Sequence, residues 1–97
     1  MPTYDTLGSF WRDFDRLTQA DQDAFIEAKS KFAEDADSGD FRASLRVKPM
    51  HGWAGIWEMS WEGNDGRATF EYGSERKPGK RHVIWRRIGT HDIFRNP

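Results

Sequence analysis

The sequence predicts a single α+β domain over residues 1–97, in which two N-terminal helices pack on a four-stranded antiparallel sheet. Apolar residues recur every three or four positions up to about residue 40, as in amphipathic helices, and alternate with polar residues from Phe41 onward, as in strands. Because the helical and strand-forming segments occupy separate parts of the chain, the pattern favours the α+β class over an alternating α/β fold. Seven Phe, five Trp and two Tyr supply the core of this small domain.

The first helix is expected to follow Ser9, whose side chain would cap it. Phe10, Phe14 and Leu17 then fall on one face at the spacing i, i+4, i+7. The preceding residues 2–7 read either as a short edge strand or as an unordered arm.

The second helix is expected to begin at Thr18, an N-cap residue followed three positions later by Asp21. It should end near Gly39, a residue suited to the C′ position. Its apolar stripe, which would face the sheet, comprises Phe25, Ala28, Phe32 and Ala33.

Four strands are predicted after Phe41, at residues 44–48, 52–61, 67–72 and 82–88. A hairpin turn at 62–66 and a basic loop at 73–80 connect the later ones. In the second strand alternation places Trp53, Trp57, Met59 and Trp61 on one face and Ile56, Glu58 and Ser60 on the other. The sheet face without helices would then carry Arg46, Lys48, Glu58 and Arg67.

The charges are unevenly distributed although the net charge is only −1. Residues 1–40 carry ten acids and four bases, whereas residues 41–97 carry six acids and eleven bases. A basic half is typical of a protein with a polyanionic partner, and a solvated surface rich in Arg is the plainer interpretation. Charge alone leaves the two open.

Composition excludes several classes of site. The chain has no cysteine, so it holds neither disulfides nor a thiolate metal site. Its three histidines are not at metal-ligand spacing, and we expect no metal and no cofactor. We recognise neither a signal peptide nor an apolar run of membrane-spanning length, which predicts a soluble, cytoplasmic protein.

Four segments resemble the RelE/ParE superfamily of toxins from bacterial type II toxin–antitoxin pairs. The segments "FRASLRVKPMHG", "GIWEMSW" and "DGRATFEY" are similar to three strands of that family, and "RRIGTHDIF" to the ending of its YafQ-type members. The likeness covers roughly residues 10–95 and implies a RelE-like fold. One arginine of the family is missing, because Glu58-Met59-Ser60 stands where it usually has Glu-Leu-Arg.

The resemblance implies a ribosome-dependent mRNA endonuclease (an mRNA interferase) that needs no metal and works by attack of the ribose 2′-OH on the adjacent phosphorus. It assigns phosphate stabilisation to Arg67, catalysis to His91, base stacking to Phe94, and RNA contacts to Arg46 and Lys48. It also implies an antitoxin partner, expected here as an acidic or amphipathic segment that wraps the basic half, besides the ribosome and mRNA.

The residues themselves offer the groups that such chemistry requires. The side chains of His91, His51, His82 and Glu58 can transfer protons. Alternation puts Arg86 on the face of His82 and Ile84, and Arg87 on the opposite face with Val83 and Trp85. We therefore expect Arg86 to join His91 and Arg67 in one basic concavity, with Lys48 and Arg46 at its rim. Arg87 is retained as an RNA-binding candidate.

Two other functions fit the same fold. A ParE-like protein would inhibit DNA gyrase without proton-transfer residues, and a degenerate member would only bind its partner. His91, Phe94 and Arg67 favour the ribonuclease.

Overall fold

The computed structural model describes residues 2–61 and 66–97, with only the backbone of His91. The predicted turn at 62–66 lies almost wholly outside these residues. Two helices and five strands form the fold, with bounds β1 Thr3–Thr6, α1 Gly8–Asp15, α2 Gln19–Ala36, β2 Lys48–Pro49, β3 Trp57–Ser60, β4 Arg67–Lys77 and β5 Lys80–Gly89. Short 3-10 helices add η1 Ala43–Leu45 and η2 His91–Arg95.

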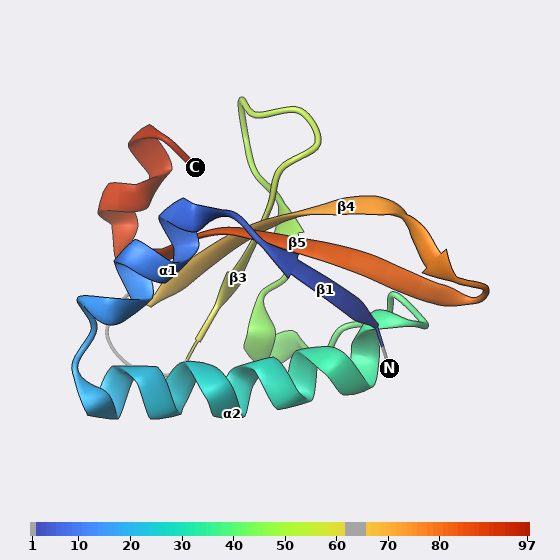
Figure 1. Cartoon of the computed structure of the whole chain (residues 1–97), viewed down its shortest axis with the longest axis horizontal. Coiled ribbons are helices and arrows are strands. Elements are labelled where there is room, and N and C mark those ends of the chain that lie inside the picture. Colours follow the sequence, from blue (N-terminus) through green and yellow to red (C-terminus); the bar gives the residue numbers. More distant parts are fainter. Residues whose placement is uncertain (1, 62–65) are drawn as a thin grey trace.

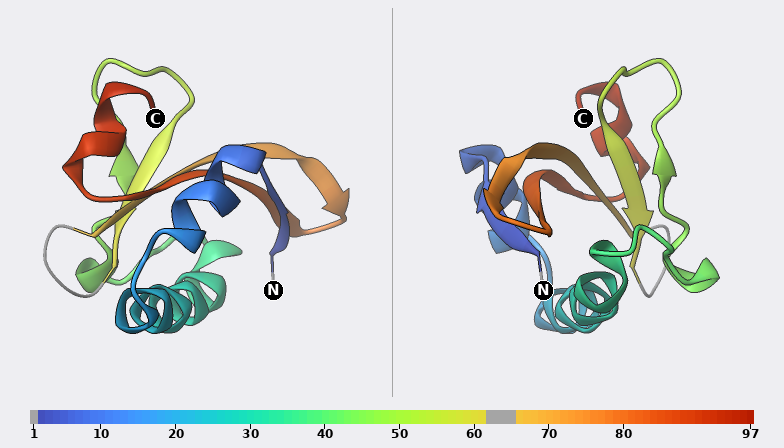
Figure 2. Two further views of the ribbon diagram at one scale, coloured as in Figure 1. Left: turned by 60° about the vertical axis from the view of Figure 1, so that its left-hand side comes forward. Right: turned by 90° about the vertical axis from the view of Figure 1, so that its right-hand side faces the viewer.

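The strands form one mixed sheet in the order β1-β5-β4-β3-β2 (Figure 1). β1 runs parallel to β5, and the other neighbours are antiparallel. Helix α2 lies across one side of the sheet, whereas η2 and the loop between β2 and β3 stand on the other side (Figure 2). The predicted α+β class is confirmed. The fifth strand is β1, so of the two alternatives given for residues 2–7, the edge strand is the correct one.

Helix α1 begins two residues earlier than predicted, because Ser9 is not its cap. The N-cap is Leu7, and the Ser9 hydroxyl donates instead to the carbonyl of Arg86 at 2.8 Å. Strand β1 ends at Thr6, so the edge of β5 beyond that point would lack partners. Side chains of α1 supply them, which satisfies the exposed backbone groups of an edge strand.

Helix α2 follows its sequence signals at both ends. The Thr18 side chain accepts a hydrogen bond from the amide of Asp21 at 3.1 Å, as an N-cap does. Gly39 has φ of +75° and donates to the carbonyls of Asp35 and Ala36, which closes the helix in the left-handed conformation that glycine tolerates.

Several predicted strand boundaries were wrong, and two of them concern the start and the middle of the sheet-forming region. Residues 43–45 form η1, Arg46 follows with φ of +48°, and β2 is left with only Lys48 and Pro49. The predicted loop at 73–80 is a continuation of the sheet, because β4 extends to Lys77 and β5 begins at Lys80. The turn predicted at Pro78-Gly79 is therefore present, but the loop around it is shorter than predicted.

The core lies between α2 and the sheet and is built from aromatic rings that pack mainly edge to face or tilted. The ring of Phe32 is fully buried, with its centroid 5.0 Å from that of Phe70 and 5.1 Å from that of Trp85. Phe25 contacts Trp85 at 5.5 Å and Phe10 at 5.7 Å, so both helices share one core. No helix within residues 2–61 and 66–97 combines the length and the apolar character needed to cross a membrane.

Substituting Phe32 with Ala should lower the free energy of unfolding by about 3–5 kcal/mol, because it opens a cavity that three aromatic neighbours border. Ile26 lies on the same helix with half of its surface exposed, and Ile26→Ala should change stability by less than about 0.5 kcal/mol. Urea unfolding of both variants measures the difference. Equal midpoints would contradict the placement of α2.

Burial should also be visible in tyrosine titration. Loss of solvation raises the pKa of Tyr4 to about 12, with the charge of Asp37 as the second cause, and burial also raises the pKa of Tyr72. Between the unfolded pKa of about 10 and the folded value, the folded chain retains a proton that the unfolded chain loses, so stability should fall as pH rises through this range. Near-ultraviolet titration of native protein, unfolded protein and Tyr4→Phe checks this; identical native and unfolded curves would refute it.

Candidate functional site

The side of the sheet away from α2, here called the open face, carries several charged residues of β2, β3 and β4. Cross-strand register places Lys48 opposite Glu58 and Glu58 opposite Thr69. Directly opposite residues share a face, and so do residues two apart on a strand. Arg67, Thr69 and Glu71 of β4 therefore lie on the same face as Glu58, as expected from the sequence.

A groove of about 360 Å³ opens on this face between the β2–β3 loop, the start of β4 and η2. We call it the β2–β3 groove; its lining residues are Lys48, Met50, His51, Trp53, Glu58, Arg67 and Phe94. Cations, a carboxylate, an imidazole and two aromatic rings thus meet in one recess. These groups come from four separate segments of the chain.

The loop that forms one wall of this groove is a compact double turn. Gly52 and Gly55 have φ of +83° and +79°, conformations that side chains disfavour. The amide of Trp53 donates to Met50 and that of Ile56 donates to Trp53, both at 3.2 Å. The prediction that Trp53 belongs to a strand and shares the face of Trp57 was therefore wrong, and its ring is 40% exposed at the groove.

Opposite charges are paired within the groove. Glu58 is only 8% exposed, and its carboxylate lies 3.9 Å from the ammonium of Lys48. Buried charged groups in proteins are usually paired in this way. The guanidinium of Arg67 donates to the carbonyl of Gly66 at 2.9 Å, which leaves its other N–H groups available for a ligand.

Arg86 and Arg87 both lie on the open face, which corrects the prediction that they point to opposite faces. A β-bulge interrupts the pairing of β4 with β5, so that Phe70 pairs with Trp85 but Thr69 pairs with Arg87. Arg86 is the extra residue, and the alternation shifts by one position after it. Trp85 and Ile88 consequently both reach the core, three residues apart.

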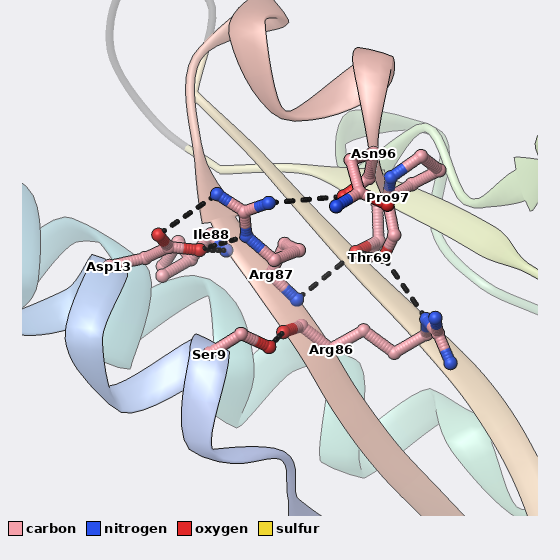
Figure 3. A network of polar contacts seen from close by, with 8 residues as sticks. All are labelled: Ser9, Asp13, Thr69, Arg86, Arg87, Ile88, Asn96 and Pro97. Atoms are coloured by element: carbon pink, nitrogen blue, oxygen red, sulfur yellow. Dashed lines mark hydrogen bonds and ion pairs between the residues drawn. The ribbon is translucent and has the colours of Figure 1, made fainter.

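The two arginines hold the C-terminal residues against the sheet (Figure 3). Arg86 donates to the carbonyl of Pro97 at 3.0 Å, and Arg87 donates to that of Asn96 at 3.1 Å. The Thr69 hydroxyl donates to Pro97 as well, at 3.2 Å. These bonds fix the segment that contains η2, and with it the wall of the β2–β3 groove that Phe94 forms.

Asp13 of α1 fixes Arg87 from the other side. Its carboxylate accepts from two guanidinium nitrogens of Arg87, at 2.6 and 3.1 Å, and from the amide of Ile88 at 3.2 Å. The hydrogen bonds to Asp13 raise the pKa of Arg87 above its usual value. Arg86 forms a second ion pair, with Glu71 at 3.3 Å. Both arginines therefore have structural partners.

The predicted residues divide between several places. Arg67, Lys48, Phe94 and Glu58 meet in the β2–β3 groove. Arg86 and Arg87 line a different pocket, beside α1, so the predicted convergence of Arg86 with Arg67 is not observed.

Of the other three candidates, Arg46 and His82 lie apart from these. Arg46 is exposed in a left-handed turn before β2, and it does not line the β2–β3 groove. His82 is 3% exposed, with its ring nitrogens 2.7 Å from the Thr3 hydroxyl and 3.0 Å from the Asp5 carboxylate, where β1 pairs with β5. His91 begins η2, and its side chain lies outside the described part of the chain.

Sequence reasoning did not place two of the groove residues there: His51 was named only as able to transfer protons, and Trp53 was assigned to a strand. The signal was present in "HGWAG", because two glycines three residues apart indicate consecutive turns. Among the described residues, no group of three His, Asp or Glu side chains has the arrangement of a metal site.

Comparison with known proteins gives structural matches only. Neither a protein-family model nor a curated protein matches the sequence. Among solved structures, a chain of the E. coli DinJ-YafQ toxin–antitoxin complex matches with TM-score 0.67 and 16% identity, over 95% of this chain and 94% of that one. YafQ from E. coli strain BL21(DE3) matches with TM-score 0.64 and 14% identity, over 96% and 97%.

A more distant source gives the same result. A chain of the RelB-RelE antitoxin–toxin complex from Methanococcus jannaschii matches with TM-score 0.58 and 13% identity, over 95% of both chains. At these identities the likeness concerns the fold. It extends over nearly the whole length of each chain, which agrees with the resemblance found in the sequence.

Replacing Asp13 with Ala should cost about 1–3 kcal/mol of stability, because it leaves the Arg87 guanidinium and the Ile88 amide without their acceptor. The side chain of Asp13 is only 10% exposed, so water cannot fully replace it. Asp15→Ala removes an exposed carboxylate from the same helix and should be nearly neutral. Chemical unfolding compares the two, and equal stabilities would show that the clamp on Arg87 is not a stabilising contact.

Proposed function

We propose that this chain, which has the RelE-like fold of type II toxin–antitoxin toxins, is a toxin that cleaves mRNA on the ribosome. The observation that carries the proposal is the β2–β3 groove. It combines two cations, Lys48 and Arg67, with groups able to transfer protons and with two aromatic rings, Trp53 and Phe94. Fold alone would not distinguish a nuclease from a binding protein, so the chemistry of the groove has to make that distinction.

The reaction is transesterification within the RNA. The ribose 2′-oxygen attacks the adjacent phosphorus and loses its proton to a base, while the 5′-oxygen leaves and takes a proton from an acid, which produces a 2′,3′-cyclic phosphate and a 5′-hydroxyl. The phosphorane carries more negative charge than the substrate, and Arg67 and Lys48 stabilise it most where that charge develops. No metal is required for this step.

Three groups are suited to the proton transfers. His51 is exposed in the wall of the β2–β3 groove, and an imidazole can both accept and donate a proton. Glu58 lies deeper and is paired with Lys48, so it serves to hold that cation, or as a base when substrate draws Lys48 away. His91 enters the proposal through the resemblance of the "GTHDIF" ending.

Aromatic side chains hold the bases on either side of the reacting phosphate. Phe94 and Trp53 stand on η2 and on the β2–β3 loop, two segments that border the β2–β3 groove. Single-stranded RNA is commonly recognised by stacking of unpaired bases on such rings. An mRNA strand positioned on a ribosome presents bases in this unpaired form.

The proposal includes a cognate antitoxin that binds the toxin and silences it. Solved structures with this fold include DinJ-YafQ and RelB-RelE complexes of toxin with antitoxin. The basic excess of residues 41–97 suits an acidic or amphipathic segment that folds as it binds. A ribosomal target also places the protein in the cytoplasm.

Arg67→Ala should reduce cleavage by about 10²–10³-fold, the typical effect of removing one group that stabilises an oxyanion. Its melting temperature should scarcely change, because the side chain makes one hydrogen bond to a backbone carbonyl. Arg76→Ala removes the same charge from the exposed end of the same strand and should cleave like the wild type. The assay mixes purified protein with translating ribosomes and mRNA and maps the cuts.

His91→Ala and His51→Ala in the same assay identify the proton-transfer groups. A general acid or base contributes about 10²–10⁴-fold in rate, and its loss should leave thermal stability intact. Intact mRNA with folded wild-type protein would refute the nuclease. Inhibition of gyrase supercoiling without RNA cleavage would support the ParE-like alternative instead.

A further inference from the structure

A second basic recess lies beside α1, at the end of the sheet where the C-terminal residues are held (Figure 3). It encloses about 240 Å³, and four arginines line it: Arg12 of α1, Arg16 at the C-cap of α1, and Arg86 and Arg87 of β5. Asp13 contributes the one acidic side chain among the lining residues. We call this recess the arginine pocket.

The four arginines have different roles in the fold. Arg86 and Arg87 are held by Glu71, Asp13 and the C-terminal carbonyls, so their guanidinium groups are fixed in place. Arg12 and Arg16 are exposed, and their side chains form neither an ion pair nor a hydrogen bond within the described part of the chain. Folding therefore accounts for the first pair but not for the second.

The free pair is positioned to act together. Arg12 lies in the last turn of α1 and Arg16 is its C-cap, four residues apart and so on one side of the helix. The negative end of the helix dipole favours cations here but does not supply a discrete acceptor for their forked N–H groups. Guanidinium forks of this kind match the geometry of phosphate and carboxylate oxygens.

Charge is segregated across the molecule, which orients an anion toward this pocket. Helix α2, on the far side of the sheet, carries five acids and two lysines in Gln19–Ala36. A polyanion is repelled by that side and attracted to the side of β5 and the C-terminal segment. Because the net charge of the whole chain is −1, this attraction comes from local arrangement rather than from an overall excess.

The C-terminal segment connects the arginine pocket to the β2–β3 groove. Asn96 and Pro97 line the pocket, and Phe94, two residues earlier, lines the groove. The two recesses therefore share the C-terminal segment as a common wall. An amphipathic peptide would need apolar surface, and the pocket offers it little beyond Leu7 and Pro97.

We propose that the arginine pocket is a second RNA-binding site, in which Arg12 and Arg16 bind backbone phosphates of the strand whose scissile phosphate lies in the β2–β3 groove. This inference rests on the proposed function for the identity of the strand. The contacts are to phosphate and carry no base specificity. Their role is to anchor and orient the RNA, and Arg86 and Arg87 form the fixed floor of the site.

The test uses fluorescein-labelled RNA with 2′-O-methyl groups throughout, which binds but lacks the attacking hydroxyl. Anisotropy titrations at several salt concentrations compare the wild type with the double variant Arg12→Ala/Arg16→Ala. Lys29→Ala/Lys31→Ala, on α2, is the matched control because it removes the same charge. Circular dichroism confirms that each variant is folded, and Arg12→Lys/Arg16→Lys retains charge while losing the fork.

The arginine double variant should bind several-fold more weakly at low salt. The slope of log affinity against log salt should become shallower by about 0.7 for each phosphate that the variant no longer binds. Lys29→Ala/Lys31→Ala should bind RNA like the wild type. The affinity of Arg12→Lys/Arg16→Lys should lie between those of the wild type and the arginine-to-alanine double variant. Equal affinity and slope for the arginine variant and the wild type would overturn the inference. So would an equal loss in both double variants, which would show that only net charge matters.

Cleavage separates this inference from the proposed function. If the wild type fails to cleave mRNA but its RNA binding depends on Arg12 and Arg16, the nuclease is refuted and the phosphate site stands. If the wild type cleaves mRNA and the arginine double variant binds RNA unchanged, the site is refuted alone. Loss of antitoxin binding with RNA binding intact would assign the pocket to an acidic partner segment and also refute it.

Discussion

The β-bulge opposite Thr69 is the constraint on which the rest of the structure depends. It lets Trp85 and Ile88 both enter the core while the two residues between them, Arg86 and Arg87, both reach the open face. Strict alternation would force one arginine into the aromatic core, where an unpaired charge is prohibitively costly. Within four residues, the bulge thus directs two large apolar side chains into the core and two positively charged side chains to the opposite face.

The position of Arg86 and Arg87 on the open face shapes both the β2–β3 groove and the arginine pocket. The two arginines fix the carbonyls of Asn96 and Pro97, and this position of the C-terminal segment sets where Phe94 stands. The same arginines form the floor of the arginine pocket. The segment from η2 to Pro97 is therefore a wall shared by both recesses. Asp13 completes the arrangement by joining α1 to the edge of β5.

Acidic and basic side chains lie on different sides of this protein, although its net charge is close to zero. The acidic helix α2 covers the core on one side, and cations gather around the open face and the end of β5 on the other. Such a distribution allows a nearly neutral chain to attract a polyanion in one orientation. Within the β2–β3 groove the pairing of Lys48 with Glu58 moderates the charge, so a ligand phosphate competes with a carboxylate already in place.

What the sequence determined by itself was local. The Thr18 cap, the Gly39 stop and the apolar stripe of α2 depend on residues within a few positions of one another, and each was readable. The class of fold followed from the change of period near residue 41. For the groove, the family resemblance indicated Arg67, Lys48 and Phe94, and the type of side chain made Glu58 a candidate for proton transfer.

Only the tertiary structure decided how those residues are grouped. The pairing of β1 with β5 and the bulge are contacts between residues far apart in sequence, and neither leaves a periodic signal. The Ser9 side chain could cap a helix or form a hydrogen bond with β5. It bonds to β5 because the carbonyl of Arg86 lies at an edge that β1 does not cover. Likewise, the arginine pocket is lined by residues of α1 and β5, which are about 70 residues apart in the sequence. Tertiary packing brings them together, so the local sequence pattern could not predict the pocket.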